Sequence, residues 1–396
     1  MQNSPNNSPL HIVEPHRSSI VRVYWYVLVV IGFLVSMSAL ASGQEQHNMA
    51  VPAEFVRYIQ LPGDGDQIIR PSSLHYDAVH DEIFVGDPGN NRVVIFSGKG
   101  AYKFEFTLNR IMTTPRDIVT DSEGYIYVVG SKPGGRAFQK FDFDGMAMDE
   151  LPLPENASGE IADIRSIAIA EDGTIIALDR SRGRVHVMAD SCFSSFALGV
   201  TFPGLQDTLE MVYGDLTISN GEILVPLSSF GTVLRYDISG KYLGRIGFFG
   251  ALPGTLNFPT SVEVSPENLY LVLDTGRFCV VCYDAEGHFL GEFGGKGYSP
   301  GWFINPSLLA VTAKDRVAVG QIYQNKIQIC TIPEFIRQGN APIHSDDSNR
   351  VPSRNQVDDL ENQRRSSIHS FPSIRLASGN VVPQSLHPYS HLEVSK

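Results

Sequence analysis

Charged residues that could bind a ligand stand directly before short apolar segments in the middle of the chain. Arg116 and Asp117 precede one such segment, Arg165 precedes a second and Asp215 precedes a third. The two aspartates offer carboxylate oxygens, the ligands that Ca²⁺ prefers. Further arginines and aromatic residues stand in nearby loops: Arg136, Arg180, Arg277, Trp302 and Tyr323. Because arginine with aromatic side chains is typical of recognition surfaces, all of these are candidate ligand-binding residues.

The stretch GDPGNNR (86–92) carries charge in a different arrangement, which indicates a structural role. Asp87 and Arg92 stand five residues apart, and Asp179 and Arg184 repeat that spacing. Because the pair recurs, we expect the aspartate at the end of one strand to bond the arginine at the start of the next. A phosphate-binding loop would lead into a helix, whereas this one leads into a β-branched segment. We therefore predict that Arg92→Ala lowers stability by about 1–2 kcal/mol without abolishing ligand binding.

The sequence gives little support for catalysis. It contains no GxSxG, HExxH or P-loop motif. His75 stands alone near the start of an apolar segment, which is more typical of a structural histidine. Cys279 and Cys282 lie three apart in a predicted strand and so point to opposite faces, which favours buried free thiols over a disulfide. No catalytic residue, metal site or cofactor is predicted.

These residues belong to a repeat that predicts the fold. Each copy reads as four short strands separated by two tight turns and one loop, the pattern of a propeller blade. The sixth copy has only three strands, and residues 54–65 supply the missing one. The predicted fold is therefore all-β: a six-bladed β-propeller of four-stranded antiparallel blades, closed by an N-terminal strand that completes the last blade. Six apolar anchors recur at intervals of 44 to 49 residues: Leu74, Ile118, Ile167, Leu216, Val262 and Leu309.

Parts of this repeat resemble the NHL-repeat family. Residues 71–96 and 257–276 are similar to an NHL repeat, and the Gly-rich loops 247–259 and 292–306 match the lead-in typical of that family. The resemblance covers about residues 54–336 and implies a six-bladed NHL-type propeller. It does not by itself imply a function, because one fold hosts many.

Enzymes on NHL-like or similar propellers provide the alternative function. One is a lyase that acts on peptidyl hydroxyglycine with His-ligated zinc in the channel, and others are calcium-dependent lactonases. The positions where such histidines would stand hold other residues, and no Glu or Asn that would complete a calcium site with Asp117 and Asp215 is evident. The six positions are Ser72, Arg116, Arg165, Gly214, Thr260 and Ser307.

The two ends of the chain differ in character from the repeat. Arg17 and Arg22 precede the uncharged apolar run 23–41, so residues 1–41 are predicted to be a signal peptide or an N-terminal membrane anchor. Either places the rest of the chain outside the cytoplasm. Residues 42–53 are predicted to be a linker. The polar residues 337–396 are poor in aromatics and are predicted to be a disordered tail.

Together these patterns favour an exported binding scaffold. In a propeller the long loops gather on one face around the channel mouth, and binding residues usually stand in such loops. The expected ligand is a protein, a peptide or a glycan, and the protein is expected to be a monomer. The net charge of −12 opposes nucleic-acid binding. The alternative is a lyase or lactonase-like hydrolase that depends on a metal in the channel.

Overall fold

The computed structural model describes residues 51–63, 66–109, 111–155, 159–189, 192–199, 211–313 and 315–338. The predicted signal peptide or anchor, most of the predicted linker, and the predicted tail from residue 339 onward lie outside the described residues. The chain divides into two units, residues 1–50 and 51–396, and all of the described residues belong to the second. Within the described residues, no helix is long and apolar enough to cross a membrane.

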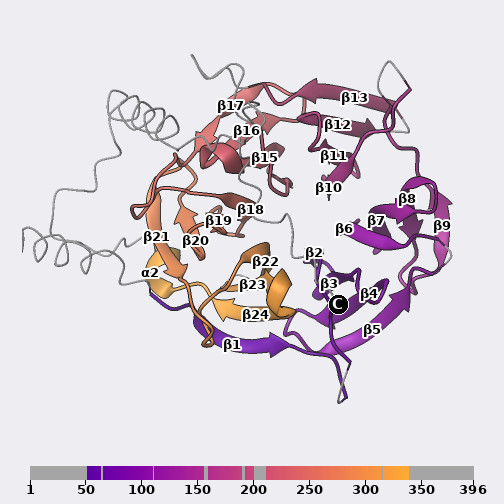
Figure 1. Ribbon diagram of the computed structural model, residues 1–396. Helices are drawn as coiled ribbons and strands as arrows, with labels where there is room; N and C mark the ends of the chain where they lie inside the picture. Colours follow the sequence, from indigo (N-terminus) through magenta and orange to yellow (C-terminus); the bar gives the residue numbers. More distant parts are fainter. Residues whose placement is uncertain are drawn as a thin grey trace, which may run out of the picture. The chain divides into compact units, whose positions relative to one another are not determined.

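Six four-stranded antiparallel sheets are arranged as blades around a ring, which confirms the predicted fold (Figure 1). Blade one contains β2 (Ser73–Asp77), β3 (Glu82–Asp87), β4 (Arg92–Ser97) and β5 (Tyr102–Thr107). Blade two contains β6 (Thr114–Thr120), β7 (Ile126–Lys132), β8 (Gly135–Phe141) and β9 (Ala147–Glu150). Blade three contains β10 (Ile164–Ile169), β11 (Ile175–Asp179), β12 (Arg184–Ala189) and β13 (Cys192–Ala197).

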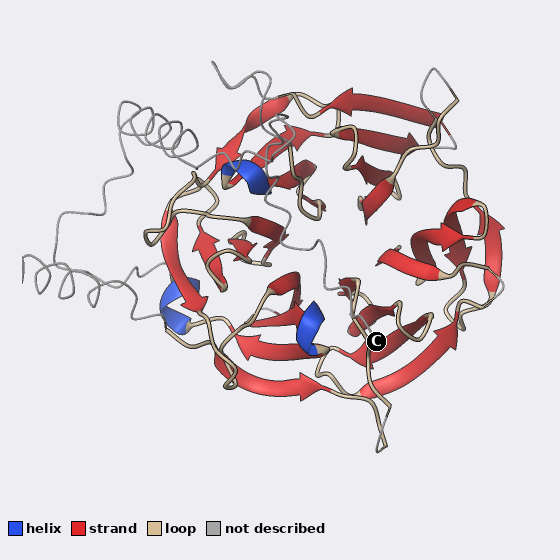
Figure 2. Cartoon of the chain, in the orientation of Figure 1, coloured by secondary structure: helices blue, strands red, loops and turns tan. Residues whose placement is uncertain are grey.

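The remaining blades follow in chain order. Blade four contains β14 (Thr217–Ser219), β15 (Glu222–Leu227), β16 (Thr232–Asp237) and β17 (Tyr242–Ile246). Blade five contains β18 (Pro259–Val264), β19 (Tyr270–Asp274), β20 (Cys279–Tyr283) and β21 (Phe289–Gly294). Blade six contains β22 (Pro306–Ala313), β23 (Arg316–Gln321) and β24 (Lys326–Thr331), together with β1 (Glu54–Ile59). The short helices η1 (Ser228–Phe230), η2 (Ile322–Gln324) and α2 (Glu334–Arg337) are the helical segments among the described residues (Figure 2).

Strand β1 closes the ring, as the repeat predicts. It pairs antiparallel with β24, so that Glu54 lies opposite Thr331 and Ile59 lies opposite Ile327. The first described strand of the chain is thus the outermost strand of the last blade (Figure 1).

The hydrophobic core lies between adjacent blades. One cluster joins Ile83 and Val85 of blade one to Ala318 and Ile329 of blade six, and other clusters join blades in the same way. Continuous apolar runs, such as those of β4 and β19, suit this arrangement, because a sheet that its neighbours cover on both faces buries successive side chains. The three described thiols, those of Cys279, Cys282 and Cys330, are buried and free in this core, as predicted for the first two.

A recurring hydrogen bond attaches the incoming connection to blades one, five and six. In these blades the last residue of the second strand accepts from backbone N–H groups just before the first strand. Asp87 accepts from Ile69 at 2.9 Å, and Gln321 accepts from Ile304 at 2.7 Å. The buried Asp274 similarly accepts from Asn257 at 2.5 Å and Phe258 at 3.0 Å. These bonds fix where the innermost strand begins in blades one, five and six.

Candidate functional site

The start of the innermost strand carries a β-bulge in several blades. The pairing register shifts between Pro115 and Asp117 in β6 and between Ile164 and Ser166 in β10, so Arg116 and Arg165 are the extra residues. A bulge changes the direction in which the extra side chain points. We call the side of the ring that carries these strand starts the loop face, and the opposite side the turn face.

Three guanidinium groups converge on one carboxylate at the loop face. Arg116 Nη1 donates to Asp163 Oδ1 at 2.7 Å, and Arg165 donates through Nε and Nη2 to Asp163 Oδ2 at 3.0 Å each. Arg136, at the start of β8, also donates to Asp163 Oδ1. We call these three arginines the arginine cluster. The structure thus brings together three of the predicted ligand-binding residues from two neighbouring blades.

The electrostatics of the arginine cluster leave it positively charged. Burial opposes ionisation of Asp163, but hydrogen bonds from Arg165 and Arg116 and the charge of Arg136 lower the pKa of this carboxyl below its usual range. Burial and the charge of Arg165 lower the pKa of Arg116. Three guanidinium groups around one carboxylate leave an excess of positive charge.

Three carboxyl groups from the innermost strands interact near the ring centre. Asp117 lies in β6, Asp215 pairs with Ser261 just before β14, and Glu263 lies in β18. We call them the axial carboxylates. Burial raises the pKa of Asp117, and the charge of Asp215 adds to the effect. Burial and then the charges of Asp117 and Asp215 raise the pKa of Glu263 to about 8.

The axial carboxylates differ in their partners. Asp117 accepts from the backbone N–H of Ile118 at 2.9 Å and from that of Ile167, in the next blade, at 2.8 Å. Asp215 forms an ion pair with Arg180, yet burial raises its pKa. The Glu263 carboxyl has no hydrogen bond or ion pair to the described residues, although the Glu263 backbone pairs with Leu271. With a pKa of about 8, the Glu263 carboxyl holds its proton at neutral pH and could exchange it or, once ionised, attract a cation.

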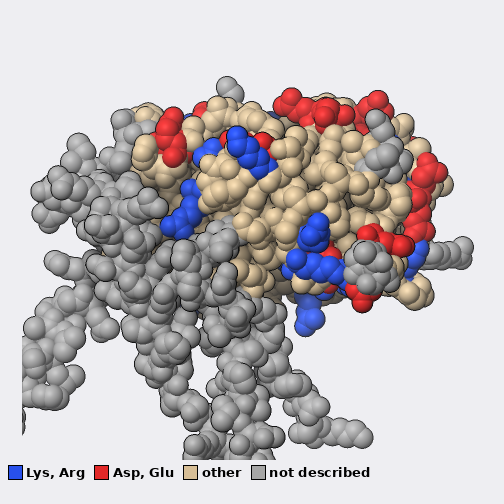
Figure 3. Space-filling view, turned by 90° about the horizontal axis from the view of Figure 1, so that it is seen from above, with Lys and Arg blue, Asp and Glu red and all other residues tan. Residues whose placement is uncertain are grey.

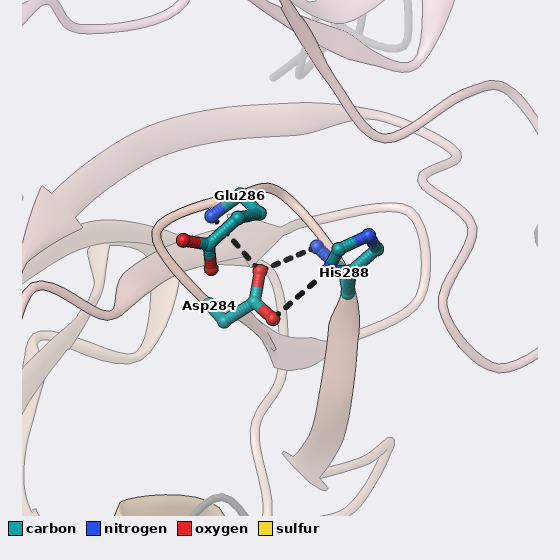
Figure 4. Close-up of side chains that lie close together, drawn as sticks. All are labelled: Asp284, Glu286 and His288. Atoms are coloured by element: carbon teal, nitrogen blue, oxygen red, sulfur yellow. Dashed lines mark hydrogen bonds and ion pairs between the residues drawn. The ribbon is translucent and has the colours of Figure 1, made fainter.

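The axial carboxylates are not a preformed metal site. Among the described residues, the group whose possible ligand atoms all lie within 4.8 Å of one another is Asp284, Glu286 and His288 (Figure 4). That group stands in the β20–β21 turn on the turn face. Asp284 Oδ1 already accepts from the N–H groups of Glu286 at 3.0 Å and His288 at 2.7 Å. The same aspartate-to-backbone bonds form at Asp121, Asp142 and Asp237, so this is the recurring turn of the fold.

The other predicted ligand-binding residues do not join these groups. The Arg277 side chain is nearly buried and donates to Thr255 O at 2.8 Å and to Glu292 at 2.6 Å. Its contacts therefore lie within blade five and the connection that precedes it. Tyr323 is 49% exposed in η2. Trp302 is half-buried in the connection to blade six, where its carbonyl accepts from Gln328. His75 lies against Thr120, with burial lowering its pKa to about 4, so it is neutral at pH 7.

The two predicted blade pairs have different outcomes. Arg92 Nε donates to the fully buried Asp87 Oδ2 at 2.9 Å, across the hairpin as expected, and Arg92 also contacts Asp66 and Glu105. The contact predicted between Asp179 and Arg184 in blade three is wrong. Asp179 is bound by Arg182 at 2.8 Å, whereas Arg184 donates to Ser195. The backbones of Asp179 and Arg184 do pair, but the β11–β12 loop directs a different arginine toward the carboxylate.

Sequence reasoning missed Asp163 and Glu263. Asp163 stands four residues before its anchor, outside the positions compared between blades. Glu263 stands one residue after its anchor, where other blades have mostly apolar side chains, and it corrects the expectation that no such acid accompanies Asp117 and Asp215. The signal in the sequence was the charge of Glu263 at a position that holds mostly apolar side chains in the other blades.

Charge on the outside of the ring is mixed. In the edge-on view of Figure 3, lysines and arginines form small separate groups, and aspartates and glutamates form others along the rim. The part of this edge that the structure describes therefore shows no extended basic stripe of the kind that binds a nucleic-acid backbone.

Comparisons with known proteins give the fold. No family model matches the chain, and no curated protein matches it. A structural genomics protein of unknown function from Bacteroides thetaiotaomicron is 11% identical, with a TM-score of 0.52, over 70% of this chain and 73% of that one. A virginiamycin B lyase from Staphylococcus aureus, solved with quinupristin, is 14% identical, with a TM-score of 0.48, over 69% and 83% of the two chains. At these identities the likeness concerns architecture alone, and the chain is a six-bladed β-propeller.

Proposed function

We propose that this protein is an exported NHL-type β-propeller that acts as a non-catalytic binding scaffold for a protein, a peptide or a glycan on its loop face. The observation that carries the proposal is the arginine cluster. Arg136 and Arg165 expose 31% and 43% of their side chains, and excess charge held on rigid strands suits recognition of a partner.

Export and the NHL assignment rest on sequence. The basic residues before the apolar run 23–41 support a signal peptide or an anchor that leaves the propeller outside the cytoplasm. The similarity of residues 71–96 and 257–276 to an NHL repeat supports the family.

The proposed function is tested by reversing charge on the loop face. The variant Arg136→Glu/Arg165→Glu is compared with Lys241→Glu, which changes an exposed lysine in the β16–β17 turn on the turn face. Each immobilised protein is incubated with extracellular proteins and glycans from the source cells, after thermal unfolding has shown that it is folded.

Capture of a partner by the wild type and Lys241→Glu, with loss in the double variant, supports the proposal. Equal capture by all three proteins excludes the loop face as the binding surface, and no capture by any of them argues against a scaffold.

A second candidate function is a metal-dependent lyase or lactonase-like hydrolase. The axial carboxylates favour it, because acids with raised pKa values cluster at functional sites. A cation would require these carboxylates to move closer together than they are here. Stoichiometric zinc or calcium in the purified protein, whose removal abolishes a lyase or hydrolase activity, would establish this alternative.

A further inference from the structure

We propose that the arginine cluster binds an oxyanionic group, a carboxylate or a phosphate, carried by the ligand. This inference rests on the proposed function, because it specifies the chemistry of the partner that the loop face recognises. It follows from the balance of charge around Asp163, from the exposure of the three arginines and from the strands that hold them.

The charge balance of this cluster differs from that of other arginines in the fold. Arg92 contacts three carboxylates, and Arg182 contacts two. Four further arginines each contact one carboxylate: Arg180, Arg235, Arg277 and Arg316. At Asp163 the ratio is inverted, because three guanidinium groups share one carboxylate. Three like charges around one carboxylate cost more than a simple ion pair does, and an anionic ligand would offset that cost.

The three arginines are also accessible. Their side chains are 22%, 31% and 43% exposed, for Arg116, Arg136 and Arg165 respectively, while Asp163 beneath them is 14% exposed. By contrast, the Arg92 and Arg277 side chains are 7% and 8% exposed. The arginines of the cluster are therefore more accessible to solvent than the carboxylate that they share.

The guanidinium groups have donors left for a ligand. Arg116 and Arg136 each donate to Asp163 through Nη1, and Arg165 through Nε and Nη2. A guanidinium carries more N–H groups than these, set in a fork that matches two oxygens of one anion. Asp163 already shows that an oxyanion fits among these groups, so a second oxyanion above it would bind by the same chemistry.

The backbone holds this arrangement in place. Arg116 and Arg165 stand at bulges in β6 and β10, and Arg136 starts β8, where its backbone pairs with Ser131 of β7. Side chains fixed on paired strands lose less freedom when a ligand binds, which favours affinity.

Binding of small oxyanions tests the inference. Inorganic phosphate and tri-galacturonate, a carboxylate-bearing glycan, are titrated separately by calorimetry into the full-length protein. We expect the wild type to bind at least one of them, and the preferred probe distinguishes phosphate from carboxylate ligands. Arg136→Gln and Arg165→Gln should each weaken that binding about tenfold, as expected for loss of a charge-assisted hydrogen bond. Arg316→Gln, on the turn face, should leave it unchanged.

The variant Asp163→Asn tests whether the arginine cluster is a binding site or only a structural ion cluster. Removing the competing carboxylate should strengthen oxyanion binding severalfold if the arginines are a receptor. If Asp163→Asn does not fold, the two glutamine variants of arginine decide the question.

No binding of either probe by the wild type, or equal binding by the arginine variants and Arg316→Gln, would overturn the inference. If a partner is nevertheless captured by the wild type and lost in Arg136→Glu/Arg165→Glu, the scaffold function stands and only the oxyanion chemistry is wrong.

Discussion

Arg92 and Arg165 show how one residue type takes two roles in this fold. Arg92 is 6% exposed and surrounded by carboxylates, one of which, Asp87, is fully buried. Arg165 leaves 43% of its side chain exposed and shares the Asp163 carboxylate with two other arginines. Burial and the number of acidic partners therefore distinguish a structural arginine from a candidate binding arginine, although both stand near the start of a blade strand.

We expect Arg92→Ala to lower the free energy of unfolding by about 3 kcal/mol, more than the sequence alone predicts. The buried Asp87 would lose its cationic partner, and breaking a buried pair costs more than losing one ordinary hydrogen bond. Chemical denaturation measures the change. Arg316→Ala is the matched control: its side chain and that of its partner Asp315 are 35% and 41% exposed, so its loss should cost less than about 1 kcal/mol. Equal effects of the two substitutions would contradict this account.

Glu263 should make stability depend on pH. Its folded pKa of about 8 lies above the ordinary value of 4.5, so the folded state holds the proton more tightly than the unfolded state. The stability that this provides is present below pH 4.5 and is lost as the pH rises toward 8. Glu263→Gln should therefore be more stable than the wild type at pH 8.5, by on the order of 2 kcal/mol, and equal to it at pH 4. A difference that does not change between these pH values would show that Glu263 is not protonated in the fold.

At the scale of elements, the sequence predicted the strands and anchors that recur from blade to blade and missed the residues that do not recur. The anchors Ile118 and Val262 recur with the blade period and are buried in the innermost strands. Glu263 follows an anchor in the alternating stretch SVEVS, which reads equally well as a strand with a solvated face. The Glu263 side chain interacts with the carboxylates of Asp117 and Asp215 only because the blades close into a ring. Asp163 and Arg182 stand in connections whose conformation has no period, so their partners could not be predicted from spacing.

The hydrogen bonds that attach the incoming connections to blades five and six should contribute unequally to stability. Asp274 accepts from three backbone N–H groups, those of Asn257, Phe258 and Arg277, whereas Gln321 accepts from Ile304. Both acceptors are nearly or fully buried. Asp274→Ala should cost at least about 3 kcal/mol and Gln321→Ala about 1–2 kcal/mol, because each buried N–H left without a partner has its own cost. Thermal unfolding measures both, and a smaller loss for Asp274→Ala would contradict this ranking.

At the scale of the whole molecule, stability depends on closing the ring. Ala53 N donates to Gly301 O at 2.9 Å, and Val51 O accepts from Gly294, so the segment around β1 joins blade six to the connection and last strand of blade five. A chain that starts at Val51 retains every described contact. A chain that starts at Pro62 lacks β1 and exposes the edge of β24.

We expect the chain that starts at Pro62 to unfold about 8–16 °C below the chain that starts at Val51. Loss of the buried Ala53 and Ile59 with the ladder of β1 corresponds to roughly 4 kcal/mol, and at this size each kcal/mol shifts the midpoint by about 2–4 °C. The exposed strand edge should also cause association, visible by size-exclusion chromatography. Equal midpoints and a monomeric profile for both chains would show that β1 is dispensable.

The pairing of β1 with β24 also has a consequence for biosynthesis. A ribosome makes β1 first, but Ile59 cannot meet Ile327 until nearly all of the propeller has been translated. The earlier blades can form as they emerge, whereas the first strand has to wait, unpaired, for the last blade. The final step of folding is therefore set by chain completion, and a nascent chain arrested before residue 326 would carry five complete blades and an N-terminal strand without a partner.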